Sequence, residues 1–214
     1  MTIHFSAAEF FDLLPIADIT FHCPATTSQS RTEAGEVIRV NRGARLWRGD
    51  ITLGKMTREE AAFCVTRLDQ LTQAGASFMI WDRRAEFPLD DPDGVIAGRE
   101  TLLHTINASG TIRLGGLPAR YQLQVGDYLG FAYAENPVRH ALHRVVAPTQ
   151  ASVNGFTPSF AIDPPLRPGA VTGTPVQLAR AACKAVIVPG SLTHAPGRAT
   201  ITEGSSFSFI QTLR

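Results

Sequence analysis

The chain has 214 residues, of which 44% are hydrophobic, and its formal net charge is +1 at pH 7. This length suits one large domain or two small ones, and the apolar content excludes a wholly disordered chain. The small net charge excludes the strong positive field of a protein that binds phosphate groups over a wide surface. A short basic cluster of Arg42, Arg45 and Arg48 is therefore interpreted as a solvated strand face.

The cysteines and the N-terminus indicate a protein that is made in the cytoplasm. Cys23, Cys64 and Cys183 are odd in number and lack Cys-x-x-Cys spacing, which argues against a zinc ribbon and a disulfide framework. We expect them to be small buried side chains. Residues 1–11 lack the basic and apolar regions of a signal peptide, and no apolar run has the length of a membrane span.

The first elements expected along the chain are a short helix and a strand. Ser6 and Glu9 fit a capping box, and Pro15 ends the helix that they open. Apolar and polar residues then alternate over 16–23, as in a half-buried strand. Residues 24–35 are polar and rich in Thr and Ser, and we expect a mobile loop there.

A hairpin is predicted next. Residues 36–40 and 46–53 both have strand composition, and Asn41-Arg42-Gly43 between them is a turn signal. We therefore expect these two strands to pair with each other.

The best-defined unit of the chain is a capped helix between two strands. Thr57 and Glu60 form a second capping box. One apolar stripe follows at intervals of three and four residues, formed by Ala61, Cys64, Leu68 and Leu71. Gly75 suits the left-handed position after a helix, and a strand is predicted over 78–81. These elements predict a sheet with one helix laid across it.

From residue 111 on, short predicted strands alternate with turns that contain Gly or Pro. The strands are expected at 111–114, 121–125, 128–133, 140–146, 157–162 and 174–178. This texture predicts a small antiparallel barrel or sandwich. Residues 185–188 and 206–210 have strand patterns like those in the first hundred residues. We therefore expect the C-terminus to close the first sheet.

The predicted fold class is mainly β (α+β), with one packed helix. Residues 1–97 and 183–214 are expected to form one discontinuous domain. Residues 98–182 are expected to form an inserted barrel-like domain.

No motif predicts a metal site. His140 and His143 are three residues apart on a predicted strand, so their side chains point to opposite faces and would not readily share a metal. Asp90, Asp91 and Asp93 resemble part of a calcium loop. They lack the glutamate and the flanking helices of an EF-hand, so we interpret them as a turn.

No motif predicts catalysis or a cofactor either. Ser191 has His194 nearby, but it does not stand in the Gly-x-Ser-x-Gly of a nucleophile elbow. A phosphate-binding Gly-x-x-x-x-Gly-Lys loop is absent from the sequence. We therefore predict a protein that is not an enzyme and that needs no cofactor.

Aromatic residues are the remaining candidates for a functional role. We expect anchors of a core or of a subunit interface at Trp47, Trp81, Phe78, Phe207 and Phe209. Tyr128, Phe131 and Tyr133 lie in one segment, and they have two interpretations. They either pack inside the barrel or form a stacking platform for a cell-surface glycan, and packing is the more frequent outcome of such alternation.

The order of these packing motifs resembles tail-tip proteins of long-tailed, siphovirus-type bacteriophages, prophages and gene transfer agents. The early motifs are Leu46-Trp47-x-Gly49, the capped helix that ends at Gly75, and residues 78–82 followed by Pro88. The later motifs are residues 116–119, 126–129, 141–145 and 164–169. The resemblance is to distal-tail-like or minor tail proteins, and it covers most of the chain.

The resemblance implies a tail-tube-like β-sandwich with a packed helix, in which neighbouring subunits join into a ring, usually of six copies. Such a ring joins the tail tube to the hub, and DNA and the tape-measure protein pass through its lumen. The implied partners are further copies of the chain, the tail tube protein, the hub and other tail-tip proteins, with the virion tail tip as the location. The alternative function is a carbohydrate-binding module of a tail tip.

Overall fold

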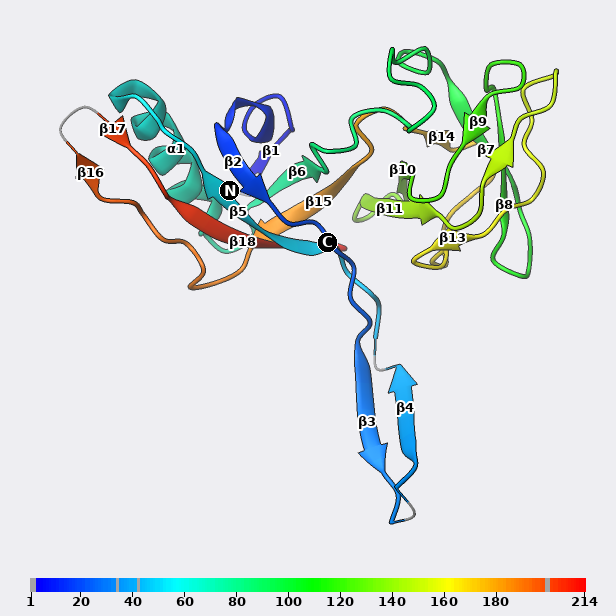
Figure 1. Cartoon of the computed structure of the whole chain (residues 1–214), viewed down its shortest axis with the longest axis horizontal. Coiled ribbons are helices and arrows are strands. Elements are labelled where there is room, and N and C mark those ends of the chain that lie inside the picture. Colours follow the sequence, from blue (N-terminus) through cyan, green and yellow to red (C-terminus); the bar gives the residue numbers. More distant parts are fainter. Residues whose placement is uncertain (1–2, 34, 42, 199–200) are drawn as a thin grey trace.

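The structure, a computed structural model, describes residues 3–33, 35–41, 43–198 and 201–214. It is mainly β, with 38% strand and 8% helix. Buried apolar side chains form two clusters, which we call the first core and the second core. Figure 1 shows the elements around these cores lying next to each other, with a two-stranded arm that projects away from both.

A six-stranded sheet carries the first core, in the strand order β1-β6-β15-β18-β5-β2. Its strands are β1 (His4–Phe5), β2 (Ile16–Ile19), β5 (Arg48–Leu53), β6 (Ser77–Trp81), β15 (Ala182–Ile187) and β18 (Ser206–Gln211). Strand β1 runs parallel to β6, and the other neighbours are antiparallel. The two C-terminal strands therefore lie at the centre of this sheet rather than at its edge.

The predicted helix is confirmed as α1 (Arg58–Leu71). Both bonds of the capping box form: the Thr57 hydroxyl accepts from the Glu60 backbone, and the Glu60 carboxylate accepts from the Thr57 backbone. The predicted stripe is buried against the sheet, and it consists of Ala61, Cys64, Leu68 and Leu71. Gly75 has a φ of +84°, as expected for the turn that follows a helix.

The short helix expected before Pro15 is present as a 3-10 helix. Ser6 donates through its backbone nitrogen and its hydroxyl to the Glu9 carboxylate, at 2.9 and 2.7 Å. The chain then forms turns and a short 3-10 helix, η1 (Phe11–Leu13), instead of an α-helix. Phe10, Phe11 and Leu14 are all buried in the first core, so this short turn packs three side chains into it.

The predicted loop and hairpin around residue 36 were also wrong. Residues of the expected loop form β3 (Thr27–Arg31), which pairs in antiparallel register with β4 (Val37–Asn41). These strands make the projecting arm (Figure 1). Strand β5 pairs instead with β2 and β18, because its alternating apolar side chains are buried in the first core. Arg42 lies outside the described residues.

Gly49 allows β2 and β5 to approach closely, and this contact gives a first prediction. A Cβ atom at this position would lie 1.8 Å from the backbone oxygen of Thr20. Gly49→Ala should therefore lower the free energy of unfolding by about 1–3 kcal/mol or more, because backbone must shift to relieve the overlap. Urea denaturation followed by circular dichroism measures the change. Gly43→Ala is the matched control, since a Cβ there meets no atom within 4 Å.

The second core lies among short strands of the middle of the chain. They are β7 (Thr101–Ile106), β8 (Ile112–Gly115), β9 (Gln122–Leu123), β10 (Tyr128–Tyr133), β11 (Arg139–Val145), β12 (Thr149–Gln150), β13 (Ile162–Asp163) and β14 (Pro175–Val176). They form separate sheets, β10-β11-β13, β14-β7-β8 and β12-β9, which do not close into a barrel. A small hairpin of β16 (Gly197–Arg198) and β17 (Ile201–Thr202) lies near the end of the chain.

Candidate interaction surfaces

Five aromatic residues that were singled out in the sequence lie inside the first core. Four of them are at most 2% exposed, and Trp81 is 6% exposed; the set is Trp47, Phe78, Trp81, Phe207 and Phe209. The indole of Trp81 donates to the carboxylate of Asp12 at 2.9 Å, so its polar group is satisfied within the chain. In this structure these rings are packing residues of the first core.

Tyr128, Phe131 and Tyr133 do not form a platform. All three are at most 7% exposed. Tyr128 belongs to the first core, whereas Phe131 and Tyr133 belong to the second, because side chains alternate across β10. Their burial contradicts a stacking surface for glycans and removes the observation that motivated that hypothesis.

Strand β10 joins the two cores through a cluster of aromatic and charged groups. The Arg144 guanidinium lies 4.6 Å from the ring centre of Trp47 and 4.8 Å from that of Tyr128. The indole of Trp47 donates to the backbone oxygen of Leu142 at 2.7 Å. Cation–π contacts of this kind gain strength where water is excluded. We call Trp47, Tyr128, Arg144 and Asp82 the junction cluster.

The charge of Asp82 is balanced by Arg84, which lies next to the junction cluster. Its carboxylate accepts from the Tyr128 hydroxyl at 3.0 Å and from the Arg84 guanidinium at 2.9 Å. Burial favours the neutral acid, but the hydrogen bonds from Arg84 and Tyr128 outweigh it and lower the pKa of Asp82. Burial also raises the pKa of Tyr128 to about 12. At neutral pH the cluster thus holds an ionised Asp82 and a neutral Tyr128, a satisfied structural network.

The two histidines of the His-x-x-His motif are not assembled into a metal site. His143 is buried, its Nδ1 is 2.6 Å from the backbone oxygen of Pro164, and its ring stacks on Phe131. Burial lowers the pKa of His143 to about 4, so the ring is neutral at pH 7. Within the described ranges, no group of three His, Cys, Asp or Glu side chains has metal-binding geometry.

Asp91 stabilises the turn in which it lies. Its carboxylate accepts from the backbone nitrogens of Val95 and Ile96 at 2.7 and 2.9 Å, and from the Tyr121 hydroxyl at 2.8 Å. Burial opposes ionisation, but these hydrogen bonds outweigh it and lower the pKa of Asp91. The aspartate-rich segment therefore has the local role that an Asx-type turn gives it.

Ser191 and His194 make separate contacts. The Ser191 hydroxyl donates to the backbone oxygen of Val188 at 2.7 Å. The Nε2 atom of His194 lies 3.2 Å from the Asp69 carboxylate, on α1. The two side chains are thus engaged with different partners, and the arrangement lacks the nucleophile-to-base hydrogen bond of a hydrolase.

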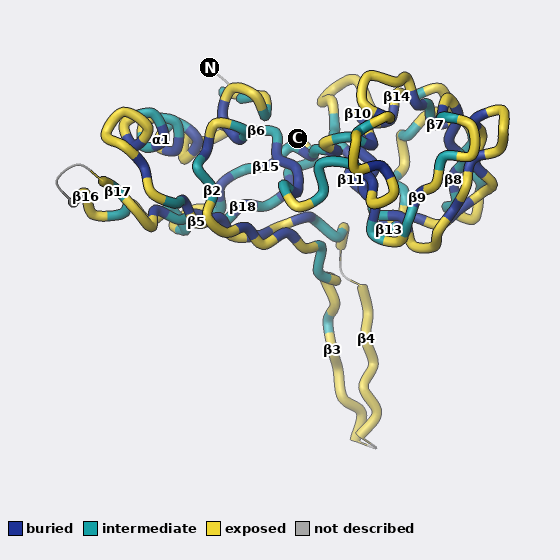
Figure 2. Tube along the Cα trace, turned by 45° about the horizontal axis from the view of Figure 1, so that its top comes forward, coloured by how far each residue is buried: buried dark blue, intermediate teal, exposed yellow. Residues whose placement is uncertain are grey.

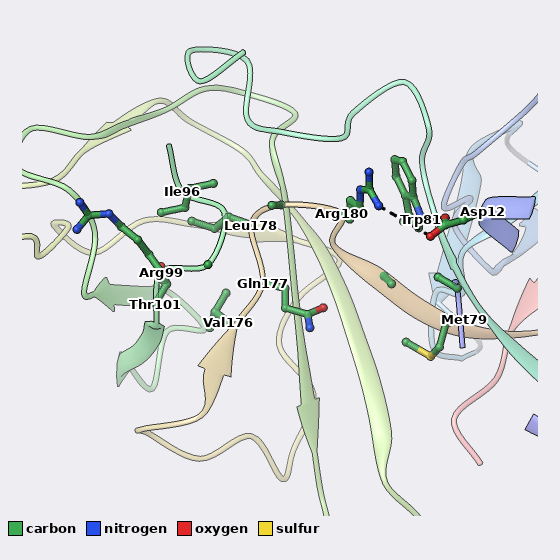
Figure 3. A pocket seen from close by; sticks show the side chains of 14 residues that line it. Asp12, Met79, Trp81, Ile96, Arg99, Thr101, Val176, Gln177, Leu178 and Arg180 are labelled. Carbon is green, nitrogen blue, oxygen red and sulfur yellow. Dashed lines mark hydrogen bonds and ion pairs between the residues drawn. The ribbon is translucent and has the colours of Figure 1, made fainter. Parts of the chain in front are cut away.

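A pocket of about 430 Å³ lies where the chain passes between the two cores, and no sequence motif predicted it. Figure 3 shows Arg180 and Asp12 at one end, with 3.9 Å between their charged atoms, and Thr101 at the other end. The Thr101 hydroxyl is buried without a hydrogen-bond partner. Asp12 and Arg180 are already paired with each other and with Trp81 or Glu86, so the charged end of the pocket is satisfied within the chain.

The arm is the largest exposed feature that sequence reasoning missed. All five residues of β4 are exposed, and Figure 2 shows exposure along nearly the whole arm. Cross-strand partners in an antiparallel ladder share a face. The register therefore places Ser28, Ser30, Ile38 and Val40 on one face, which we call the apolar face. The opposite face carries Thr27, Gln29, Arg31, Val37, Arg39 and Asn41.

The apolar face has two β-branched side chains that are open to solvent. Ile38 is 49% exposed and Val40 is 59% exposed, and the serines opposite them are too small to cover them. An isolated two-stranded hairpin with bare β-branched side chains is marginally stable in water. It also presents unpaired strand edges, which natural proteins normally cover or block with charge. The arm therefore has the properties of a segment that is covered in an assembly.

No protein-family model matches this sequence, and a search of curated proteins finds no match. The described helices include none that is long and apolar enough to cross a membrane.

Proposed function

We propose that this protein is a structural subunit of a phage-type tail tip, which assembles with further copies of itself into a ring. The observation that carries the proposal is the projecting arm with its exposed apolar face. Burying Ile38 and Val40 against another chain would remove apolar area from water, at roughly 25 cal/mol per Å². This burial would stabilise the arm in an assembly.

The edges of the six-stranded sheet also support assembly. One edge is β1, which has two residues, and the other is β2, whose pairing with β5 is interrupted by a register shift. Short and irregular edges prevent indiscriminate pairing while they leave room for a specific neighbour. Head-to-tail contacts between such edges generate a closed ring when the rotation between subunits closes.

In the proposed assembly, residues 1–97 and 183–214 form the tail-tube-like ring unit, and residues 98–182 form a unit on the outside of the ring. The ring has six copies, joins the tail tube to the hub, and continues the channel for DNA and the tape-measure protein. Its role is structural and non-enzymatic, and its location is the tail tip of the virion. The division of the buried side chains into two cores supports these two units.

The arm gives a direct test, and it is our second prediction. Purified wild-type protein should show rings in negative-stain images and a ring-sized mass in light scattering. Ile38→Asp/Val40→Asp should abolish the rings, because it places charges on the face that a neighbour covers. Its unfolding midpoint should stay close to that of the wild type, since the arm contacts neither core.

Gln29→Asp is the matched control. It adds a carboxylate to the same arm on the opposite face, next to Arg39, and it should leave the rings intact. A wild-type protein that stays monomeric at high concentration, alone and with tail partners, would contradict the proposed function.

A further inference from the structure

The base of the arm contains a pocket of about 450 Å³ that three arginines line. Arg45 comes from the segment after the arm, Arg139 opens β11, and Arg167 lies in the proline-rich segment 164–168. The volume is within the usual range for a ligand site. We call it the arginine pocket. The sequence interpretation of Arg45 as part of a solvated strand face was wrong, because its side chain is partly buried here.

The arginine pocket has more positive charge than its own carboxylates balance. Arg45 forms an ion pair with Asp163 and donates to the backbone oxygen of Cys23 at 2.8 Å. Arg167 donates to the backbone oxygen of Arg45. Within the described ranges, Arg139 has no ion-pair partner.

Two donor atoms of these arginines lack acceptors. The Nε atoms of Arg45 and Arg139 are both buried without a hydrogen-bond partner. A buried donor that is left unpaired costs about 1–3 kcal/mol. These two Nε atoms are closed to solvent, so an entering carboxylate would accept from the terminal nitrogens of the guanidinium groups that line the pocket.

The turn at the tip of the arm carries two carboxylates, while the exposed arginines of the arm, Arg31 and Arg39, lie on the flanking strands. Glu33 and Glu36 are exposed there, and in the described part of the chain neither forms an ion pair. The turn is held by Thr32, whose backbone nitrogen donates to the Glu36 oxygen at 3.0 Å. Figure 1 shows that the tip lies at the far end of the arm from its base, so these glutamates do not reach the arginine pocket of their own chain.

We propose that the arginine pocket binds the acidic arm tip of a second copy of this chain. Glu33 and Glu36 of one subunit enter the pocket, where they meet Arg139 and Arg167 of the next. The contact is head-to-tail, because each subunit uses its tip on one neighbour and its pocket on the other. The inference rests on the proposed ring and assigns the residues that set the order of its subunits.

Charge reversal in the full-length chain tests this contact. Glu33→Lys/Glu36→Lys places lysines opposite the arginines, and Arg139→Glu/Arg167→Glu places glutamates opposite the acidic tip. Each pair alone should weaken self-association in sedimentation equilibrium by at least about tenfold. The chain that carries all four changes should regain association, because the charges are complementary again. Higher salt should weaken the wild-type contact.

The variants distinguish the loss of the contact between subunits from the unfolding of the subunit itself. The tip residues are exposed, so Glu33→Lys/Glu36→Lys should keep the wild-type unfolding midpoint and circular dichroism spectrum. Glu100→Lys/Glu203→Lys makes the same change in net charge at exposed positions outside the arm and should not alter association. If the pocket variant fails to fold, the tip variant and this control still decide the matter.

The outcomes distinguish this inference from the proposed function. Rings that persist in the folded tip variant overturn the inference and leave the ring proposal standing. Open, charge-dependent association of the wild type without rings supports the inference and overturns the ring. A wild type that is monomeric at every concentration overturns both. Binding of a short DNA duplex that requires Arg139 and Arg167, with association unaffected by the tip variant, would assign the pocket to phosphate instead.

Discussion

Leu68→Asp should leave the protein unfolded. Leu68 is fully buried on α1, at the centre of the stripe that holds the helix against the six-stranded sheet. An aspartate there would be a buried charge without a partner, and its cost is roughly 4 kcal/mol or more. The lost packing of the leucine side chain adds about 2–5 kcal/mol, and the sum is comparable with the roughly 5–15 kcal/mol by which a typical domain is stable. Circular dichroism and the yield of soluble protein measure the result.

The control for Leu68→Asp uses the same helix. Ala62→Asp adds the same carboxylate at an exposed position of α1. It should fold and unfold at nearly the wild-type midpoint. A folded, ring-forming Leu68→Asp protein would refute the packing of α1 on the sheet.

Trp47→Ala should cause the second large loss of stability. The ring is 1% exposed and lies 5.3 Å from the ring of Phe21 and 5.5 Å from that of Tyr128, measured between ring centres. Its removal leaves a cavity in the first core and takes one aromatic face from Arg144. Truncating a buried tryptophan to alanine costs about 3–5 kcal/mol. Guanidinium denaturation followed by far-ultraviolet circular dichroism measures the free energy of unfolding.

Trp47→Phe separates the ring from its hydrogen bond. Phenylalanine keeps an aromatic face near Arg144 but loses the donor to the Leu142 oxygen, at a cost of about 1–3 kcal/mol. An alanine variant that is as stable as the phenylalanine variant would contradict the role of Trp47 in packing the junction cluster.

Local signals in the sequence predicted the parts of the fold that local physics determines. The capping box at Thr57 and the stripe through Leu68 are short-range patterns, and the structure reproduces them. The strand expected at 128–133 matches β10 in both bounds, since the turn at Gly126 and the aromatic content both mark it. These features do not depend on which distant segment packs nearby.

The sequence patterns did not predict which distant segments pair with each other. Strand β3 has no apolar residue to show alternation, so its polar composition was interpreted as a loop. Strand β5 pairs with β18, about 160 positions further along the chain, and a nearby turn signal favoured the wrong partner. Strand β7 was missed altogether.

The candidate surfaces were harder to predict than the fold. The assignment of Tyr128 to one core and Phe131 to the other depends on β10 lying between them, which composition does not reveal. The arginine pocket assembles residues 45, 139 and 167, which come together through tertiary contacts alone. A signal was present only for the arm tip, where two glutamates flank a turn.

The central position of β15 and β18 has a consequence for the order of events during synthesis. Strands β5 and β6 emerge from the ribosome early, but the two strands that join them are the last long strands of the chain. The first core therefore stays incomplete until residue 211 has been made, whereas nearly all of the second core comes from one continuous stretch, residues 96–178. Non-local pairing is slow because its loop must close first. On the nascent chain, the second core would thus be complete while the first core is still incomplete. The arm would be exposed to solvent before any subunit can assemble.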